Sequence, residues 1–246
     1  IVYTEVFFAP TAFLKLGFKY EDMVKIFDEK IENIYKKHGI IVKMIMDVSR
    51  TFGCDNAMKN YELLKQFPSK NIIGIGLGGA ESKGPAKDFA PVYDLAVKEG
   101  YVVVAHAGED VGPESIWDAL NYLHAQSIGH GLTACQDEEL MKSLEKSKTP
   151  IEICITSNTF TKKIVQKAKD HPVKMYVGRG ISVYINTDDP VDFKTTLINE
   201  YWLCHHDLNF TMDEIKQLVK NSFLQAFMSD KEKKDYQDKG QLKELI

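Results

Sequence analysis

Two patterns of apolar and polar positions alternate along most of the chain: continuous apolar runs, and segments in which apolar residues recur at helical spacing. Continuous apolar runs, typical of strands buried on both faces, lie at 1–8, 40–46, 71–77, 101–105, around 128, 150–154 and 181–185. Apolar residues at helical spacing separate most of these runs, at 21–37, 57–67, 87–98, 113–123 and 138–144. We therefore predict seven strands alternating with helices, followed by a wholly helical segment from Thr195 to Ile246.

Apolar strands that alternate with amphipathic helices predict an α/β fold with a parallel sheet covered on both faces. A parallel (β/α)8 TIM barrel needs eight strands, because a barrel with seven would expose two sheet edges and its core. We therefore expect the first strand to lie upstream of Ile1, where the sequence opens on a strand-like run without an initiator Met. Residues 1–246 would then be a single barrel domain, N-terminally incomplete, with C-terminal helices. An open doubly wound sheet is the alternative.

Composition narrows the classes of partner. Hydrophobic residues make up 44% of the chain and charged residues 27%, which is typical of a soluble globular protein with a sizeable core. The net charge of −4 is spread along the chain without a basic stripe, so we expect no nucleic acid partner. No apolar run is long enough for a membrane span, and the four scattered cysteines fit reduced thiols. We expect a cytoplasmic monomer.

Polar residues cluster where three of the predicted strands end. His-Ala-Gly-Glu occupies 106–109, Gly-His-Gly occupies 129–131 and Asn-Thr-Asp-Asp-Pro occupies 186–190. The chemistry of a parallel barrel gathers at the carboxyl ends of its strands, so we expect these clusters to form one site.

The residue types in these clusters fit metal and acid–base chemistry. A neutral imidazole at His106 is a good zinc ligand, and a protonated Glu109 can act as an acid. Adjacent carboxylates at Asp188 and Asp189 repel each other unless a cation offsets their charge, which favours metal ligation by one and hydrogen bonding by the other. Each cluster also has a purely structural interpretation: a hydrogen-bonded histidine at a strand end, a carboxylate at a helix entry, or a turn between glycines, as around His130.

The clusters occur in an order that resembles the adenosine deaminase family. The ordered motifs are His-Ala-Gly-Glu at 106–109, Ile-Gly-His-Gly at 128–131, Thr-Ser-Asn at 156–158, His-Pro at 171–172 and Asn-Thr-Asp-Asp-Pro at 186–190. Each motif is weak alone, and their order makes the resemblance specific. It extends from the strand at 4–6 to the helix at 200–201, which is most of the chain.

The resemblance implies a zinc-dependent mechanism. His106 and Asp188 would be two of the ligands of a single Zn²⁺ ion, which would lower the pKa of a bound water. Glu109 would donate a proton to the ring nitrogen next to the carbon under attack. His130 would orient the water or take its proton.

The resemblance also implies a small-molecule purine nucleoside or base as substrate. Asp189 would accept or share a hydrogen bond with the nitrogen of the five-membered ring. Gly79 would offer its backbone N–H to the far ring nitrogen, since only a residue without a side chain permits so close an approach; a loose turn is the alternative. The expected reaction is hydrolytic deamination of adenosine to inosine and ammonia, within purine metabolism. Adenine, or a modified adenine nucleoside or nucleotide, is the alternative substrate.

One family feature is missing from the sequence. The first strand of the family carries a His-x-His pair that supplies the two remaining zinc ligands, and the chain has no such pair. His205 and His206 are adjacent and lie in a predicted helix, where we expect them to be exposed. We therefore expect the missing ligands upstream of Ile1. A non-catalytic nucleoside-binding barrel is a second class of function, and a metal hydrolase acting on an amide or phosphoester is a third, although only Lys43 hints at a bridging lysine.

Overall fold

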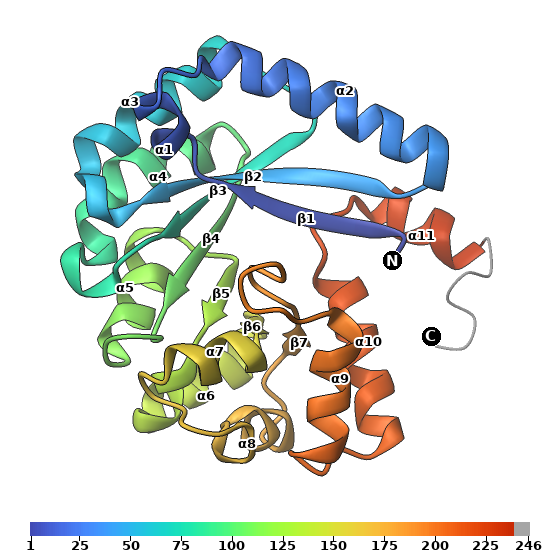
Figure 1. The fold of residues 1–246 in the computed structure, drawn as a ribbon. Coiled ribbons are helices and arrows are strands. Elements are labelled where there is room, and N and C mark those ends of the chain that lie inside the picture. Colours follow the sequence, from blue (N-terminus) through green and yellow to red (C-terminus); the bar gives the residue numbers. More distant parts are fainter. Residues whose placement is uncertain (239–246) are drawn as a thin grey trace. The chain divides into compact units, whose positions relative to one another are not determined.

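The chain folds around a sheet whose seven strands follow sequence order. A computed structural model describes residues 1–238. The strands are β1 (Tyr3–Phe8), β2 (Ile41–Ser49), β3 (Ile72–Gly78), β4 (Val102–Ala107), β5 (Ser127–His130), β6 (Ile151–Ile153) and β7 (Val183–Ile185) (Figure 1). The strands run parallel, as the registers of β1 with β2 and of β6 with β7 illustrate. A doubly wound sheet reverses its strand order at a switch point, and this sheet has no reversal. The predicted partial (β/α)8 barrel is confirmed.

Helices occupy most of the connections between strands. They are α1 (Pro10–Lys15), α2 (Tyr20–His38), α3 (Gly53–Gln66), α4 (Ala90–Lys98), α5 (Glu114–Tyr122), α6 (Glu138–Ser147), α7 (Ile155–Thr161), α8 (Val173–Gly178), α9 (Leu197–His206), α10 (Met212–Gln225) and α11 (Asp230–Asp238). Short 3-10 turns lie at Arg50–Phe52, Glu81–Lys83, Ala86–Phe89, Leu132–Gln136 and Ala168–Asp170. The sequence predicted a helical C-terminal segment, and its described part forms three helices, α9, α10 and α11; residues 239–246 of that prediction lie outside the described residues.

The contacts divide the chain into two compact units. The first contains 1–106 and 118–126, and the second contains 107–117 and the described residues from Ser127 to Asp238. Each unit contains some of the residues that the sequence singled out, so each is described by itself.

In the first unit, glycines in β3 make room for side chains of β1 and β2. A Cβ atom on Gly78 would lie 2.4 Å from Oδ2 of Asp47, and one on Gly76 would lie 3.0 Å from Cε1 of Phe7. The sequence predicted that the second strand ends at Met46, but β2 continues to Ser49. The reason is that β3 leaves space for the Asp47 carboxyl group inside the sheet layer, so this polar residue does not end the strand.

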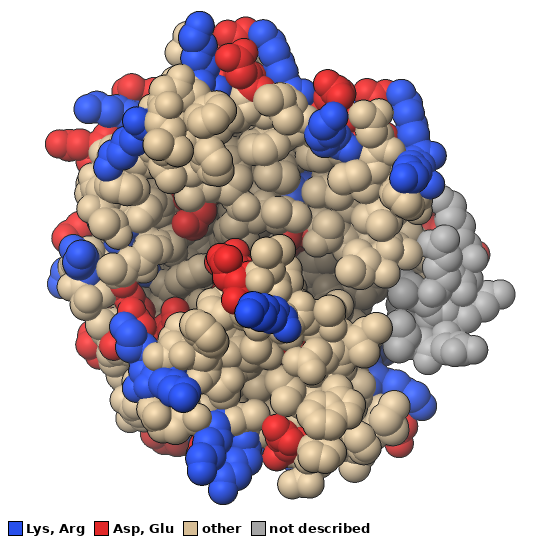
Figure 2. Space-filling view, viewed as in Figure 1, with Lys and Arg blue, Asp and Glu red and all other residues tan. Residues whose placement is uncertain are grey.

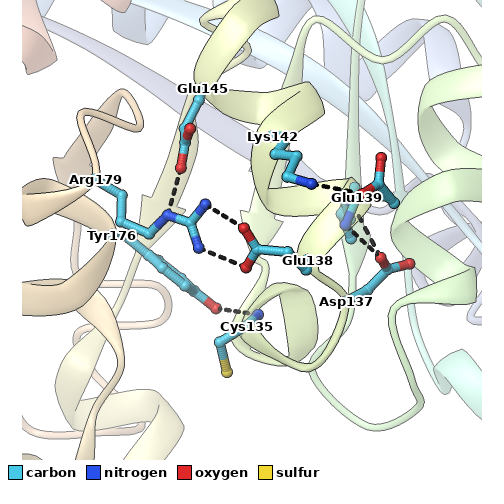
Figure 3. Close-up of polar contacts among 9 residues, drawn as sticks. Cys135, Asp137, Glu138, Glu139, Lys142, Glu145, Tyr176 and Arg179 are labelled. Atoms are coloured by element: carbon cyan, nitrogen blue, oxygen red, sulfur yellow. Dashed lines mark hydrogen bonds and ion pairs between the residues drawn. The ribbon is translucent and has the colours of Figure 1, made fainter.

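In the second unit, a polar network joins α6 to α8 (Figure 3). Asp137 caps α6 by accepting hydrogen bonds from the backbone N–H groups of Glu139 and Leu140, at 2.9 and 3.1 Å. The Arg179 guanidinium follows α8 and holds the Glu138 carboxylate with two parallel hydrogen bonds of 2.7 Å. Its Nε atom donates to Glu145. Bidentate pairing of this kind fixes orientation as well as distance, so α8 has a defined position against α6.

The surface and the cysteines agree with the composition. In the face shown in Figure 2, lysines, arginines and acidic residues are scattered among other residues, and neither sign forms a continuous field among the residues drawn in colour. All four cysteines lie in the described part of the chain and are free thiols. Within residues 1–238, none of the helices combines the length and apolarity that crossing a bilayer requires.

Candidate functional site

Two of the predicted catalytic side chains meet in the second unit. His130 is the last residue of β5, and Glu109 follows the end of β4. Nε2 of His130 lies 3.5 Å from Oε2 of Glu109. The His130 side chain is 4% exposed and the Glu109 side chain 18%, so the pair is shielded from bulk water. The two strand ends that the sequence singled out therefore lie next to each other, and their joint role in catalysis stays a prediction.

Gly108 fixes the turn that carries Glu109. Its φ of +71° is in the left-handed region, and a Cβ atom would lie 2.6 Å from Cδ1 of Ile116 and 2.7 Å from Oγ1 of Thr133. The Gly108 carbonyl oxygen accepts hydrogen bonds from the backbone N–H and the hydroxyl of Thr133, at 3.0 and 3.2 Å. Only glycine fits this position, because both the backbone conformation and the available space exclude a side chain.

His130 and Asp188 both adopt left-handed backbone conformations, with φ values of 66° and 56°. Such values are uncommon for residues other than glycine, and they concentrate at functional sites where the surrounding structure enforces them. The loop after His130 is enforced in this way: the buried Tyr176 hydroxyl lies 2.9 Å from the carbonyl oxygen of Gly131 and 3.2 Å from the backbone nitrogen of Cys135, the latter contact visible in Figure 3.

Helix α7 holds His130 and Asp188 through two consecutive residues. The Ser157 hydroxyl donates a 2.6 Å hydrogen bond to Oδ2 of Asp188. The Asn158 amide lies next along the helix, and its Nδ2 atom is 2.9 Å from Nδ1 of His130. Both α7 side chains are buried. The ends of β5 and β7 are therefore tied to one short helix.

The first residue of the Thr-Ser-Asn motif anchors the helix itself. The backbone N–H of Thr156 donates to the carboxylate of Glu200 on α9 at 3.1 Å, and its hydroxyl donates to the same carboxylate. The hydroxyl of Thr195 donates to it as well, at 2.6 Å. Glu200 is fully buried, so these hydrogen bonds are what make its burial tolerable.

A buried histidine extends the contact between Asn158 and His130. Nε2 of His171 lies 3.1 Å from Oδ1 of Asn158, and the backbone N–H of Val173 donates a 3.1 Å hydrogen bond to Nδ1 of His171. Burial, with a smaller contribution from the nearby His130, lowers the pKa of His171 to about 3. His171 is therefore neutral throughout the physiological range.

The buried His171 is expected to make stability fall as the solution is acidified. Its pKa is lowered by folding, so below about pH 6.5, the ordinary histidine value, the unfolded chain takes up a proton that the folded chain does not. The free energy of unfolding should then fall by up to roughly 1.4 kcal/mol per pH unit from about pH 6 toward pH 4. Replacing His171 with Asn should remove this slope, because Asn does not titrate.

Urea denaturation midpoints at several pH values measure this effect as the difference between the two proteins. Taking the difference cancels the other titrating groups that both proteins share. Parallel pH profiles for wild type and His171→Asn would show that His171 titrates equally in both states, and would contradict the expectation.

Asp189 follows Asp188 and is more exposed. Partial burial, together with the neighbouring charges of Asp188 and Asp192, raises the pKa of the Asp189 carboxyl group. A raised pKa favours the protonated carboxyl group, which is the form that can donate a hydrogen bond to a ring nitrogen.

The other two predicted residues lie in the first unit. His106 lies inside β4, one residue before its end, and its ring packs edge-on against Phe7 with centroids 5.9 Å apart. The buried Arg50 guanidinium donates to the backbone oxygen of His106. Gly79 has φ of +83°, and a Cβ atom on it would lie 2.4 Å from Oγ of Ser49. A side chain would therefore not fit at Gly79, and the predicted contact of its backbone N–H with a purine ring stays a prediction.

The donor types of the two predicted ligands, His106 and Asp188, suit a zinc ion. Asp188 has a carboxylate oriented by Ser157, and His106 has an imidazole; both are ordinary zinc donors. Over the span from Ile1 to Asp238, no group of three or more His, Cys, Asp or Glu side chains is arranged to hold a metal ion. That His106 and Asp188 bind the same ion stays a prediction, and His205 and His206 are exposed on α9, as expected.

Sequence reasoning assigned no role to four residues of this site. Ser157, Asn158 and His171 stand in motifs that carried the family resemblance, but their spacing along the chain does not reveal what they contact. Glu200 is an acidic residue in a helix, and no local feature of the sequence indicates that the fold buries its side chain. The sequence did contain one hint of these roles: the Thr-Ser-Asn and His-Pro motifs belong to the family resemblance, but no chemical role had been assigned to them.

Comparison with known proteins gives the same assignment over nearly the whole chain. A family model described as adenosine deaminase matches residues 1–241. An aminodeoxyfutalosine deaminase of Streptomyces avermitilis is 32% identical over 92% of this chain and 63% of its own length. An adenosine deaminase of Haemophilus ducreyi is 33% identical over 95% of this chain and 69% of its own length. The chain thus spans about two thirds of these relatives.

Solved structures agree at the level of the fold. The crystal structure of an adenine deaminase from Arthrobacter aurescens is 28% identical, with a TM-score of 0.92 over 96% of this chain and 72% of that chain. An amidohydrolase from Burkhoderia ambifaria with bound Zn has the same TM-score of 0.92 at 23% identity, covering all of this chain and 69% of its own, and shares the fold.

Proposed function

Because this chain belongs to the adenosine deaminase family, we propose that it performs the zinc-dependent hydrolytic deamination of a purine, with adenosine as the first candidate substrate. The reaction replaces the ring amino group with oxygen from water: adenosine and water give inosine and ammonia. The observation that carries the proposal is that consecutive residues of α7 hold Asp188 and His130, while His130 reaches Glu109.

Of the residues in this chain, His106 and Asp188 would hold the metal. A zinc ion lowers the pKa of water so that a nucleophile is available near neutral pH. Ser157 orients the Asp188 carboxylate for this role by its 2.6 Å hydrogen bond, and partners of this kind tune how well a ligand binds a metal.

Glu109 would protonate the ring nitrogen next to the carbon that carries the amino group. Protonation there breaks the aromaticity of the ring and lets the carbon accept the nucleophile. Gly108 and Thr133 fix the turn that carries this carboxyl group. His130, 3.5 Å from Glu109, would orient the attacking water or take its proton.

Two residues would position the base. A protonated Asp189 would donate a hydrogen bond to the acceptor nitrogen of the five-membered ring, and the raised pKa of its carboxyl group supports that state. Gly79 would present its backbone N–H to the ring nitrogen on the far side. A substrate that keeps the adenine ring would satisfy both contacts, whatever its sugar.

The proposal has two parts: the reaction type, given above, and the choice of substrate among adenine compounds. The relatives are described as acting on adenosine, adenine and aminodeoxyfutalosine. The residues assigned above would contact only the purine ring, so they do not distinguish among these compounds. Adenosine stays our first candidate, with adenine next.

An absorbance assay on the native, zinc-loaded protein tests both the reaction type and the choice of substrate. Conversion of an adenine ring to a hypoxanthine ring changes its ultraviolet absorbance, so adenosine, adenine, adenosine monophosphate and aminodeoxyfutalosine can be compared in parallel. We expect loss of the adenosine signal with release of one ammonia per turnover. If zinc-loaded protein converts none of the four compounds, the deaminase proposal fails; if it converts adenine fastest, only the choice of substrate fails.

A further inference from the structure

The buried chain of contacts from Val173 to His130 determines which nitrogen of His130 carries a proton. The chain passes through His171 and Asn158, and all of its side chains are buried: Asn158 is 0% exposed, His130 3% and His171 5%. Its donors and acceptors can be assigned from one end, because one member is a backbone N–H whose polarity is fixed.

The assignment starts at the backbone of Val173. This N–H can only donate, so Nδ1 of His171, at 3.1 Å, must be an acceptor without a proton. An imidazole without a proton on Nδ1 carries its proton on Nε2. Nε2 of His171 is therefore a donor, and the Asn158 atom that it faces at 3.1 Å must be the amide oxygen.

The amide then transmits this polarity to His130. With its oxygen facing His171, the Asn158 amide presents its NH₂ group to Nδ1 of His130 at 2.9 Å. Nδ1 of His130 must accept this hydrogen bond and so carries no proton. The neutral ring is consequently protonated on Nε2, the nitrogen that lies 3.5 Å from the Glu109 carboxylate.

We propose that Asn158 and His171 are positioning residues that lock His130 in the neutral tautomer with its proton on Nε2, so that His130 acts as a hydrogen-bond donor in the site. This rests on the proposed function, in which His130 faces the attacking water. Of the two roles left open for His130, the lock selects orientation of the water, because an Nε2 atom that already carries a proton does not take another one from water.

The frame around the lock is rigid enough to maintain it. Val173 is the first residue of α8, whose Tyr176 holds the loop after His130 and whose flanking Arg179 is clamped to α6 (Figure 3). His130 and the donor that sets its tautomer are thereby attached to the same framework. The left-handed φ of His130, at 66°, shows that this framework also enforces the backbone.

Replacing Asn158 with Asp tests the lock with almost no change of shape. A carboxylate still accepts the Nε2–H of His171 on one oxygen, but its other oxygen also accepts, so Nδ1 of His130 must become protonated. Two-bond ¹H–¹⁵N spectra of the histidine side chains identify the protonated nitrogens directly. We expect His130 to show a proton on Nε2 only in the wild type and a proton on Nδ1 in Asn158→Asp, with the His171 pattern unchanged.

Activity should follow the tautomer. We expect Asn158→Asp to lower kcat/KM about 10- to 100-fold, the usual effect of removing a partner that orients a site residue. The matched control is Asn60→Asp in the first unit, where a buried amide donates to Thr11 at 2.7 Å. This control introduces the same buried charge, and we expect it to leave the His130 spectrum and kcat/KM unchanged.

A second variant keeps the proposal testable if Asn158→Asp does not fold. In His171→Asn, the shorter side chain can still accept from the Val173 N–H, but it cannot reach Asn158. The amide then loses its fixed orientation, and His130 should show both tautomers. A folded Asn158→Asp or His171→Asn protein whose His130 keeps its proton on Nε2 alone would overturn the lock. The spectra do not depend on turnover, so an inactive wild type would count against the deaminase proposal and leave the lock standing.

Discussion

Replacing Glu109 with Gln is expected to lower kcat/KM for purine deamination about 100- to 10,000-fold, the range that proton transfer by a positioned side chain contributes. Gln keeps the size of the side chain, but its amide is far too weak an acid to protonate the ring nitrogen. The turn at Gly108 should keep its shape, since its packing against Ile116 and Thr133 does not involve position 109. The loss should appear in kcat, because the ring can still bind.

The control for Glu109→Gln is Glu114→Gln. Glu114 is an exposed carboxylate in the first turn of the helix that follows, so the change in charge is the same. Steady-state rates with adenosine compare the two. Equal rates for wild type and Glu109→Gln, with the fold retained by circular dichroism, would remove Glu109 from the mechanism.

Replacing Asp188 with Asn is expected to weaken zinc binding and to lower activity by at least about 100-fold, because zinc is held by charged or imidazole donors and an amide oxygen is a poor substitute. Asn is the appropriate replacement, because after Gly it is among the residues that best tolerate the left-handed φ of 56° at this position. The backbone and the contact with Ser157 should survive, so the loss can be attributed to the ligand rather than to misfolding.

Metal content after dialysis against a series of zinc buffers measures the effect of Asp188→Asn. Asp192→Asn is the matched control, since it removes a charge from the same loop at an exposed position. We expect Asp192→Asn to retain zinc like the wild type. If Asp188→Asn retains zinc with unchanged affinity, Asp188 is not a ligand, and the zinc site must be assigned to other residues.

The sequence predicted the sheet better than the short helices around it. All seven strands were anticipated, since apolar runs such as 101–105 are long and uniform. Helix α7 was missed because the apolar run that forms β6 continues through Cys154 into Ile155, so the start of the helix carries no change of pattern. The end of β2 was placed too early because the room for Asp47 is provided by β3, and no local signal describes it.

The sequence singled out residues for the candidate site, but it did not reveal the hydrogen bonds that connect them. The contact between His130 and Glu109 follows from the rule that strand ends share one face of a barrel. The path from His171 through Asn158 joins segments separated by a turn and a helix, and its direction depends on one backbone N–H at Val173. Hydrogen-bond polarity of this kind is a property of the folded chain and has no periodicity in the sequence.

At position 130, the residue that the left-handed backbone favours for stability differs from the residue that the proposed function needs. Glycine would adopt the φ of 66° without cost, whereas a histidine there costs on the order of 1 kcal/mol. A sequence optimised only for thermal resistance would therefore accept glycine at 130, and its neighbours Gly129 and Gly131 show that small residues already suit this loop. Engineering this protein for heat tolerance by consensus or computational design should accordingly hold position 130 fixed, because the substitution that most relaxes the chain there also removes its imidazole.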